Sequence, residues 1–164
     1  MAFPYNPQLS FKPSETHHYV AFDSDSSELS NQNDYMIHFE SPYKNVVSIS
    51  IESACLPKGD NDYVTLKLND IDNVQSAGIM TEDGKIQREK AIDNAFAIFH
   101  FDHSTEHDGK EKQFFVSSDI IPNTKHLQSP IGRLASLHVR WESKSDNAFT
   151  DNNHVFVLKI TTIS

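Results

Sequence analysis

Hydrophobic positions recur with a period of two along most of the chain, and clusters of Asn, Asp, Ser, Pro and Gly separate the alternating runs. Successive side chains of a β-strand point to opposite faces, so this period predicts strands with one buried face, which a helix would not produce. The runs predicted as strands cover residues 17–22, 35–40, 47–52, 63–68, 95–101, 113–116, 123–127, 134–141 and 155–163. Roughly eight or nine strands fit one antiparallel sandwich or barrel.

The buried faces of these runs define the expected core. Apolar side chains that share one face of a strand pack against the facing sheet of a sandwich. The residues expected mainly in the core are Ile49, Ile51, Leu66, Leu68, Phe96, Ile98, Leu137, Val139, Phe156 and Leu158.

The first residues differ in composition from the rest of the chain. Pro4, Pro7 and Pro13 fix the backbone dihedral and remove hydrogen-bond donors. Residues 1–16 are therefore predicted to form an extended arm, and residues 17–164 a single domain.

A second stretch, residues 69–94, also breaks the alternation, because its charge rises and its β-branched residues become sparse. It is predicted to be a long loop. Residues 86–92 include Gln, Arg, Glu, Lys and Ala, which favour helix, so at most two helical turns are expected there.

Composition and charge narrow the classes of function. A length of 164 residues suits one domain, and 37% hydrophobic residues suffice for a core. Lys and Arg number 14 against 23 Asp and Glu, and the net charge of -9 argues against a nucleic-acid partner. No run reaches the roughly 20 apolar residues that span a bilayer, so neither a membrane span nor a leading export signal is expected.

The densest group of metal-ligand side chains lies in residues 100–108, which hold His100, His103 and His107 together with three carboxylates. On a strand, His100 and His103 would face opposite sides, and the spacing matches no known zinc motif. A polar turn is therefore preferred to a metal site, although zinc stays the alternative.

Paired aspartates raise the separate question of calcium. Each pair lacks the glycine and the bidentate glutamate of an EF-hand in register, so solvated turn carboxylates are preferred. The pairs are Asp23 and Asp25, Asp60 and Asp62, and Asp70 and Asp72.

Cys55 and Trp141 are two further candidates for a functional role. Cys55, the only cysteine, ends an alternating run and is predicted to be a buried, inert thiol. Trp141 ends another run and is predicted to anchor the core, with a sugar-stacking platform as the alternative. The sequence also holds no nucleophile elbow, phosphate-binding glycine loop or dinucleotide fingerprint. We therefore expect no enzyme activity, no catalytic residue, no metal and no cofactor.

Several strand patterns carry a resemblance to a known group of proteins. They are residues 41–57 (SPYKNVVSISIESACLP), 63–70 (YVTLKLND), 94–99 (NAFAIF), and the closing pair 130–139 and 153–160. Their order and spacing resemble the single jelly-roll penton and minor capsid proteins of large eukaryotic DNA viruses and their virophages. The resemblance implies an all-β, antiparallel single jelly-roll sandwich of about eight strands with an extended N-terminal arm.

The same resemblance implies a structural role in the virion. The expected protein is a penton that forms a homopentamer at icosahedral vertices and contacts the major capsid protein. Contacts between the copies are expected in the polar loops 23–33, 71–93 and 102–112, and the arm is expected to face the particle interior or an adjacent subunit. One alternative is a minor, cement-type capsid protein away from the vertices. The other is a non-viral carbohydrate-binding β-sandwich module.

Overall fold

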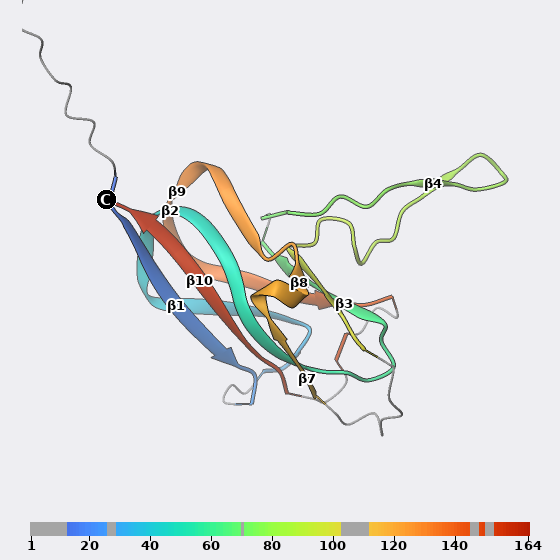
Figure 1. The fold of residues 1–164 in the computed structure, drawn as a ribbon, viewed down its shortest axis with the longest axis horizontal. Coiled ribbons are helices and arrows are strands. Elements are labelled where there is room, and N and C mark those ends of the chain that lie inside the picture. The colour runs from blue at the N-terminus through green and yellow to red at the C-terminus, as the bar shows by residue number, and fades with distance from the viewer. Residues whose placement is uncertain (1–12, 26–28, 70, 103–111, 145–147, 150–152) are drawn as a thin grey trace, which may run out of the picture.

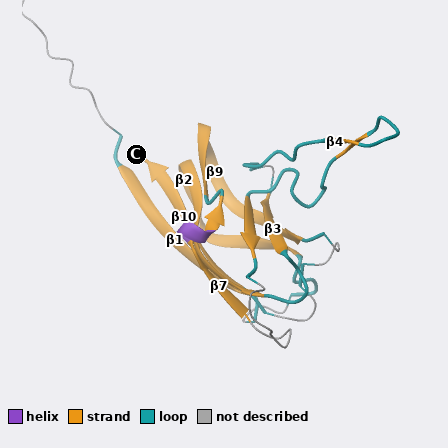
Figure 2. Cartoon of the chain, turned by 45° about the vertical axis from the view of Figure 1, so that its right-hand side comes forward, coloured by secondary structure: helices purple, strands orange, loops and turns teal. Residues whose placement is uncertain are grey.

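The computed structural model describes residues 13–25, 29–69, 71–102, 112–144, 148–149 and 153–164. In these residues the chain is nearly all β, with one short turn of 3-10 helix (Figures 1 and 2). The elements are β1 (Glu15–Asp23), β2 (Asp34–Pro57), β3 (Tyr63–Leu68), β4 (Ile79–Met80), β5 (Ile86–Gln87), β6 (Ala97–His100), β7 (Lys112–Val116), η1 (Ser117–Asp119), β8 (Ile120–Ile121), β9 (Thr124–Glu142) and β10 (Val155–Ile163).

An eight-stranded antiparallel sheet curls over on itself to make the two layers of a sandwich (Figure 1). In one layer the order is β1, β10, the second half of β2, and β7. In the other layer the order is the first half of β2, then β9, β3 and β6. These two orders are those of a jelly roll, so the predicted all-β jelly-roll sandwich is confirmed. Residues 1–12 of the predicted N-terminal arm lie outside the described residues.

Two long strands join the layers, where the sequence had predicted four separate runs. The runs at 35–40 and 47–52 belong to β2, and those at 123–127 and 134–141 belong to β9. Pro42 and Pro130 lie between these predicted runs, and both stand where the β2–β9 register shifts and pairing is interrupted. A missing N–H costs no ladder hydrogen bond at such a position, so the strand bends there and continues.

The interior between the layers is filled by the predicted core residues, all of which are buried except Ile98. Ile98 is half-buried because β6 directs Ala97 and Phe99 inward, which turns Ile98 to the opposite face beside Thr65. Thr65 itself is buried on that outer face, where its hydroxyl donates to the Ala91 carbonyl over 2.8 Å. The segment around residue 91 therefore covers part of the outer surface of β3.

Residues 86–92, where at most two helical turns were expected within a long loop, form no helix. β4 and β5 pair instead as a short hairpin, closed by the Thr81 N–H to Lys85 carbonyl bond of 2.8 Å and by Gly84 at a φ of 77°. Only a hydrogen-bonded turn follows, from Glu89 to Asp93. Composition favours a helix here, but hairpin pairing of the flanking residues decides the backbone.

Asn45 holds a left-handed backbone, with a φ of 50°, next to the bend of β2. Asn45→Ala is expected to lower the free energy of unfolding by about 1 kcal/mol, because alanine adopts the left-handed conformation less readily than asparagine does. Asn45→Gly, which removes the same side chain without the backbone strain, is the matched control and should cost less. Urea unfolding followed by fluorescence measures both, and equal losses would contradict a backbone cause.

Candidate functional site

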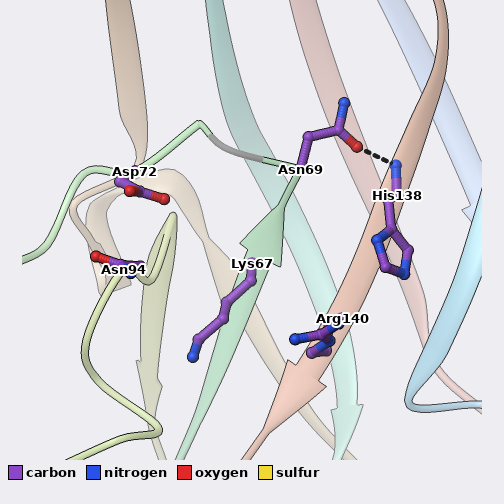
Figure 3. Close-up of a pocket in the computed structure, with 6 residues that line it drawn as sticks. All are labelled: Lys67, Asn69, Asp72, Asn94, His138 and Arg140. Atoms are coloured by element: carbon purple, nitrogen blue, oxygen red, sulfur yellow. Dashed lines mark hydrogen bonds between the residues drawn. The ribbon is translucent and has the colours of Figure 1, made fainter.

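A polar hollow of about 460 Å³ opens on the outer face of β3 and β9. Antiparallel register brings Lys67 of β3 opposite Arg140 of β9. His138 lies two residues before Arg140 on the same face of its strand. Asp72 and Asn94 come from the segment beside β3, as Figure 3 shows. The hollow thus gathers residues far apart in the chain.

The charged side chains of this face pair with one another. The Lys67 ammonium lies 2.6 Å from a Glu142 carboxylate oxygen and also donates to the Lys90 carbonyl over 3.0 Å. The Arg140 Nε lies 3.4 Å from Asp34, which His138 contacts through its other carboxylate oxygen. Charges of both signs therefore neutralise each other along the row.

Two interactions show the role of these paired charges on the outer face of β3 and β9. The hydrogen bond from His138, aided by its charge and that of Arg140, lowers the pKa of the Asp34 carboxyl below its usual value. The Asn69 side-chain oxygen accepts a hydrogen bond from the His138 backbone N–H, which fixes the end of β3 against β9 (Figure 3). The arrangement holds strands in register and suits a small polar solute, but its lining residues include no Ser, Thr or Cys nucleophile.

A second polar group is wholly interior. The Trp141 indole N–H donates to the Tyr35 oxygen over 3.1 Å, and the Tyr35 hydroxyl lies 2.7 Å from His154 Nε2. An indole N–H can only donate, so we assign the Tyr35 proton to the bond with His154. That assignment leaves the His154 ring proton on Nδ1, which has no hydrogen-bond partner among the described residues.

Burial shifts the pKa values of His154 and Tyr35 in opposite directions. Loss of solvation lowers the pKa of His154 to about 4 and raises the pKa of Tyr35 above its usual value. The neutral forms are therefore favoured near neutral pH. Sequence reasoning did not single out Tyr35 or His154, because they are 119 positions apart and no local motif links them.

The predicted metal candidates are only partly described. His100 is exposed at the end of β6, with its ring 6.3 Å from that of Tyr63, whereas His103 and His107 lie outside the described residues. Among the residues that the structure describes, no group of three or more His, Cys, Asp or Glu side chains is placed to hold a metal ion.

The described residues of the three aspartate pairs lie in different parts of the fold. Asp23 accepts a hydrogen bond from the Asp25 backbone N–H over 3.0 Å, and Asp25 accepts one from the Asn153 side chain. Asp60 and Asp62 are exposed. Of the third pair, Asp72 lines the polar hollow and Asp70 lies outside the described residues.

The predicted burial is wrong for Cys55 and confirmed for Trp141. The Cys55 thiol is half-buried rather than buried, because its position on β2 lies between Val155 and Phe114 on the less covered face of the sheet. Trp141 is 1% exposed, so its prediction as a core anchor is confirmed. Its ring is closed off from solvent, and stacking on a sugar would require the core to open.

Large apolar side chains are exposed in three places. One is the β4–β5 hairpin, where Ile79, Met80 and Ile86 are 73%, 72% and 66% exposed. Figure 1 shows this hairpin projecting away from the sandwich. Another is on β7 and β8, where Phe114 and Ile121 are exposed, and the third is on β1 and β2, where Tyr19 and Met36 are exposed. Apolar surface of this kind is typical of contact sites between protein chains.

The sequence matches no protein-family model and no curated protein. In the described part of the chain, no helix has the length and apolar character needed to cross a membrane.

Proposed function

We propose that the protein is a structural capsid protein of the penton type, which forms a closed ring of five copies at icosahedral vertices. In the virion, this ring contacts the major capsid protein around it. The proposal joins the resemblance of the strand patterns to a physical requirement, namely that a vertex needs head-to-tail contacts that close on themselves.

The observation that carries the proposal is the exposed apolar hairpin. Ile79, Met80 and Ile86 extend from the sandwich on two paired strands, where the hairpin itself offers them little cover. A neighbouring copy would remove this area from water, which stabilises the contact by about 25 cal/mol for each Å² of apolar surface.

The resemblance supports the same role. Its strand patterns fall on β2, β3, β6, β9 and β10, which supply most of both layers. The carbohydrate-binding alternative depended on an exposed tryptophan, and Trp141 is buried.

The oligomeric state of the purified chain tests the ring. Native mass spectrometry over a range of protein concentration and salt is expected to show a species five times the mass of one chain. The double variant Ile79→Glu with Met80→Glu should shift it to the monomer, because two buried charges disfavour the contact. The matched control is Gln75→Glu with Ala77→Glu, which adds the same charge at exposed positions just before the hairpin.

Two results would contradict the proposal in different ways. A ring unaffected by Ile79→Glu with Met80→Glu would remove the hairpin from the contact. Electron microscopy of particles with density for this chain away from every five-fold vertex would exclude a penton and support the cement-type minor capsid protein.

A further inference from the structure

The open side of the sandwich holds a groove of about 740 Å³ between β1 and the first half of β2. In the described part of the chain, β1 pairs only with β10, and residues 34–38 of β2 pair only with β9. Each strand therefore turns a row of unpaired backbone N–H and C=O groups toward the groove. Such edges are templates for an added strand unless something covers them.

The floor of the groove is apolar and aromatic. Val20, Phe22, Phe39 and Tyr43 line it, are half-buried, and pack on the core from the open side. The Phe39 and Tyr43 rings lie 5.0 Å apart, and the Phe22 ring stacks on Tyr35 at 4.9 Å. The groove thus combines backbone groups for pairing with apolar surface for alternate side chains.

The N-terminal sequence has the pattern of a strand that would fit this groove. In residues 1–12 the apolar residues Phe3, Tyr5, Leu9 and Phe11 all fall on odd positions, so an extended chain would present them on one face. Residues 8–12 also contain no proline, so each of their backbone N–H groups is available to a ladder.

The charge of the N-terminal segment also suits the groove. The first twelve residues hold one lysine, Lys12, and no acidic residue, whereas all 23 Asp and Glu of the chain follow them. Glu40 lies on the rim of the groove. A segment without carboxylates therefore meets an acidic body without like-charge repulsion.

The groove suits the segment of a neighbouring copy better than the chain's own. The Ser164 N–H donates to the Ser14 carbonyl over 3.1 Å, so the β1–β10 ladder still includes residue 14. If the chain's own segment folded back through a tight turn just before residue 14, residues 8–12 would lie beside the start of β1. The groove lies further along β1, beside residues 19–22, so Pro4 and Pro7 would lie in it instead. Only another copy brings the proline-free stretch there, and twelve extended residues reach roughly 40 Å.

We propose that residues 8–12 of one copy add as a strand to the groove between β1 and β2 of the next, with Leu9 and Phe11 on the apolar floor. This inference rests on the proposed self-assembly and names one contact that would carry it. Backbone pairing supplies affinity, and the two apolar side chains set the register.

Hydrogen exchange of the full chain tests the inference. The amides of residues 19–22 and 36–40 are expected to exchange about tenfold more slowly, or slower still, at high protein concentration than at low. Leu9→Asp with Phe11→Asp should abolish this protection. Gln8→Asp with Ser10→Asp adds the same charge on the opposite face of the segment and should retain most of it.

Each other outcome overturns the inference. Protection that does not depend on concentration would show that the groove holds the chain's own segment. Protection that survives Leu9→Asp with Phe11→Asp would show a different occupant, and no protection would show an empty groove. Native mass spectrometry of the same samples separates the two proposals. A ring of five without protection keeps the penton proposal alone, whereas protection with open chains or dimers keeps the groove contact alone.

Discussion

Replacing Trp141 with alanine is expected to lower the free energy of unfolding by about 3–5 kcal/mol, the usual cost of deleting a buried large aromatic side chain. The Trp141 ring packs against those of Phe99, Phe149 and Phe156 at centroid distances of 5.5, 5.3 and 5.6 Å. Alanine would leave a cavity among these rings. It would also leave the Tyr35 oxygen without the indole donor, which adds the cost of an unmade buried hydrogen bond.

Trp141→Phe is the matched control, because it keeps an aromatic ring and removes the indole N–H. Its cost should be clearly smaller than that of Trp141→Ala. Urea unfolding monitored by far-ultraviolet circular dichroism measures both variants. A loss below about 1 kcal/mol for Trp141→Ala would mean that the ring lies outside the core.

Acidification from pH 7 to pH 5 is expected to destabilise the protein by about 2 kcal/mol through His154 alone. The pKa of this imidazole is about 4 in the folded chain and 6.5 as the ordinary value. Between these values the unfolded chain binds more protons than the folded one. The free energy of unfolding therefore includes the full contribution of the neutral ring, about 3 kcal/mol, above pH 6.5. This contribution decreases as the pH falls and is gone below pH 4.

The surroundings of His154 explain the size of this effect. Phe149 stacks on the ring at 4.8 Å, Trp141 meets it edge-on at 5.3 Å, and the Tyr35 hydroxyl already donates to its acceptor nitrogen. A protonated ring could no longer accept that bond, and its charge would be buried. Loss of solvation is the largest cause of the lowered pKa, Lys112 adds to it, and Asp23 opposes it.

Stability measured against pH in the wild type and in His154→Gln isolates the contribution. The wild type should lose stability between pH 7 and pH 5, and the variant should show a flatter profile whatever its absolute stability. Asp34 and Glu52 have pKa values held below the usual 3.8 and 4.5 by their partners, so their effects fall at lower pH. An equally steep profile in His154→Gln would assign the loss to other groups.

The sequence predicted the layers of the fold well because alternation reports directly on which face is buried. The bounds of β3 and β10 agree with the predicted runs. Continuity across Pro42 and Pro130 was missed, since a proline interrupts a strand only where its missing N–H would have paired. The β4–β5 hairpin was missed because two-residue strands leave no periodic signal.

The polar hollow was beyond sequence reasoning for a different reason. Lys67, His138 and Arg140 meet only because β3 and β9 pair in one particular register. A slip of one residue would turn these side chains to the interior. Burial was predicted for both Trp141 and Cys55 from their strand patterns. Trp141 is buried as predicted, whereas Cys55 is half-buried, because its face of β2 is covered only in part.

The place of β10 between β1 and β2 has a consequence for synthesis of the chain. Glu15 pairs with Ile163 at one end of the β1–β10 ladder, so contacts that close this layer join residues near opposite ends of the sequence. Pairing across such separations makes folding slow. While the chain is still on the ribosome and β10 has not been made, β1 lacks its only partner among the described strands, and the second half of β2 lacks one of its neighbours. Both strands are then open to wrong pairing, and chaperones that shield strand edges are expected to matter most at this stage.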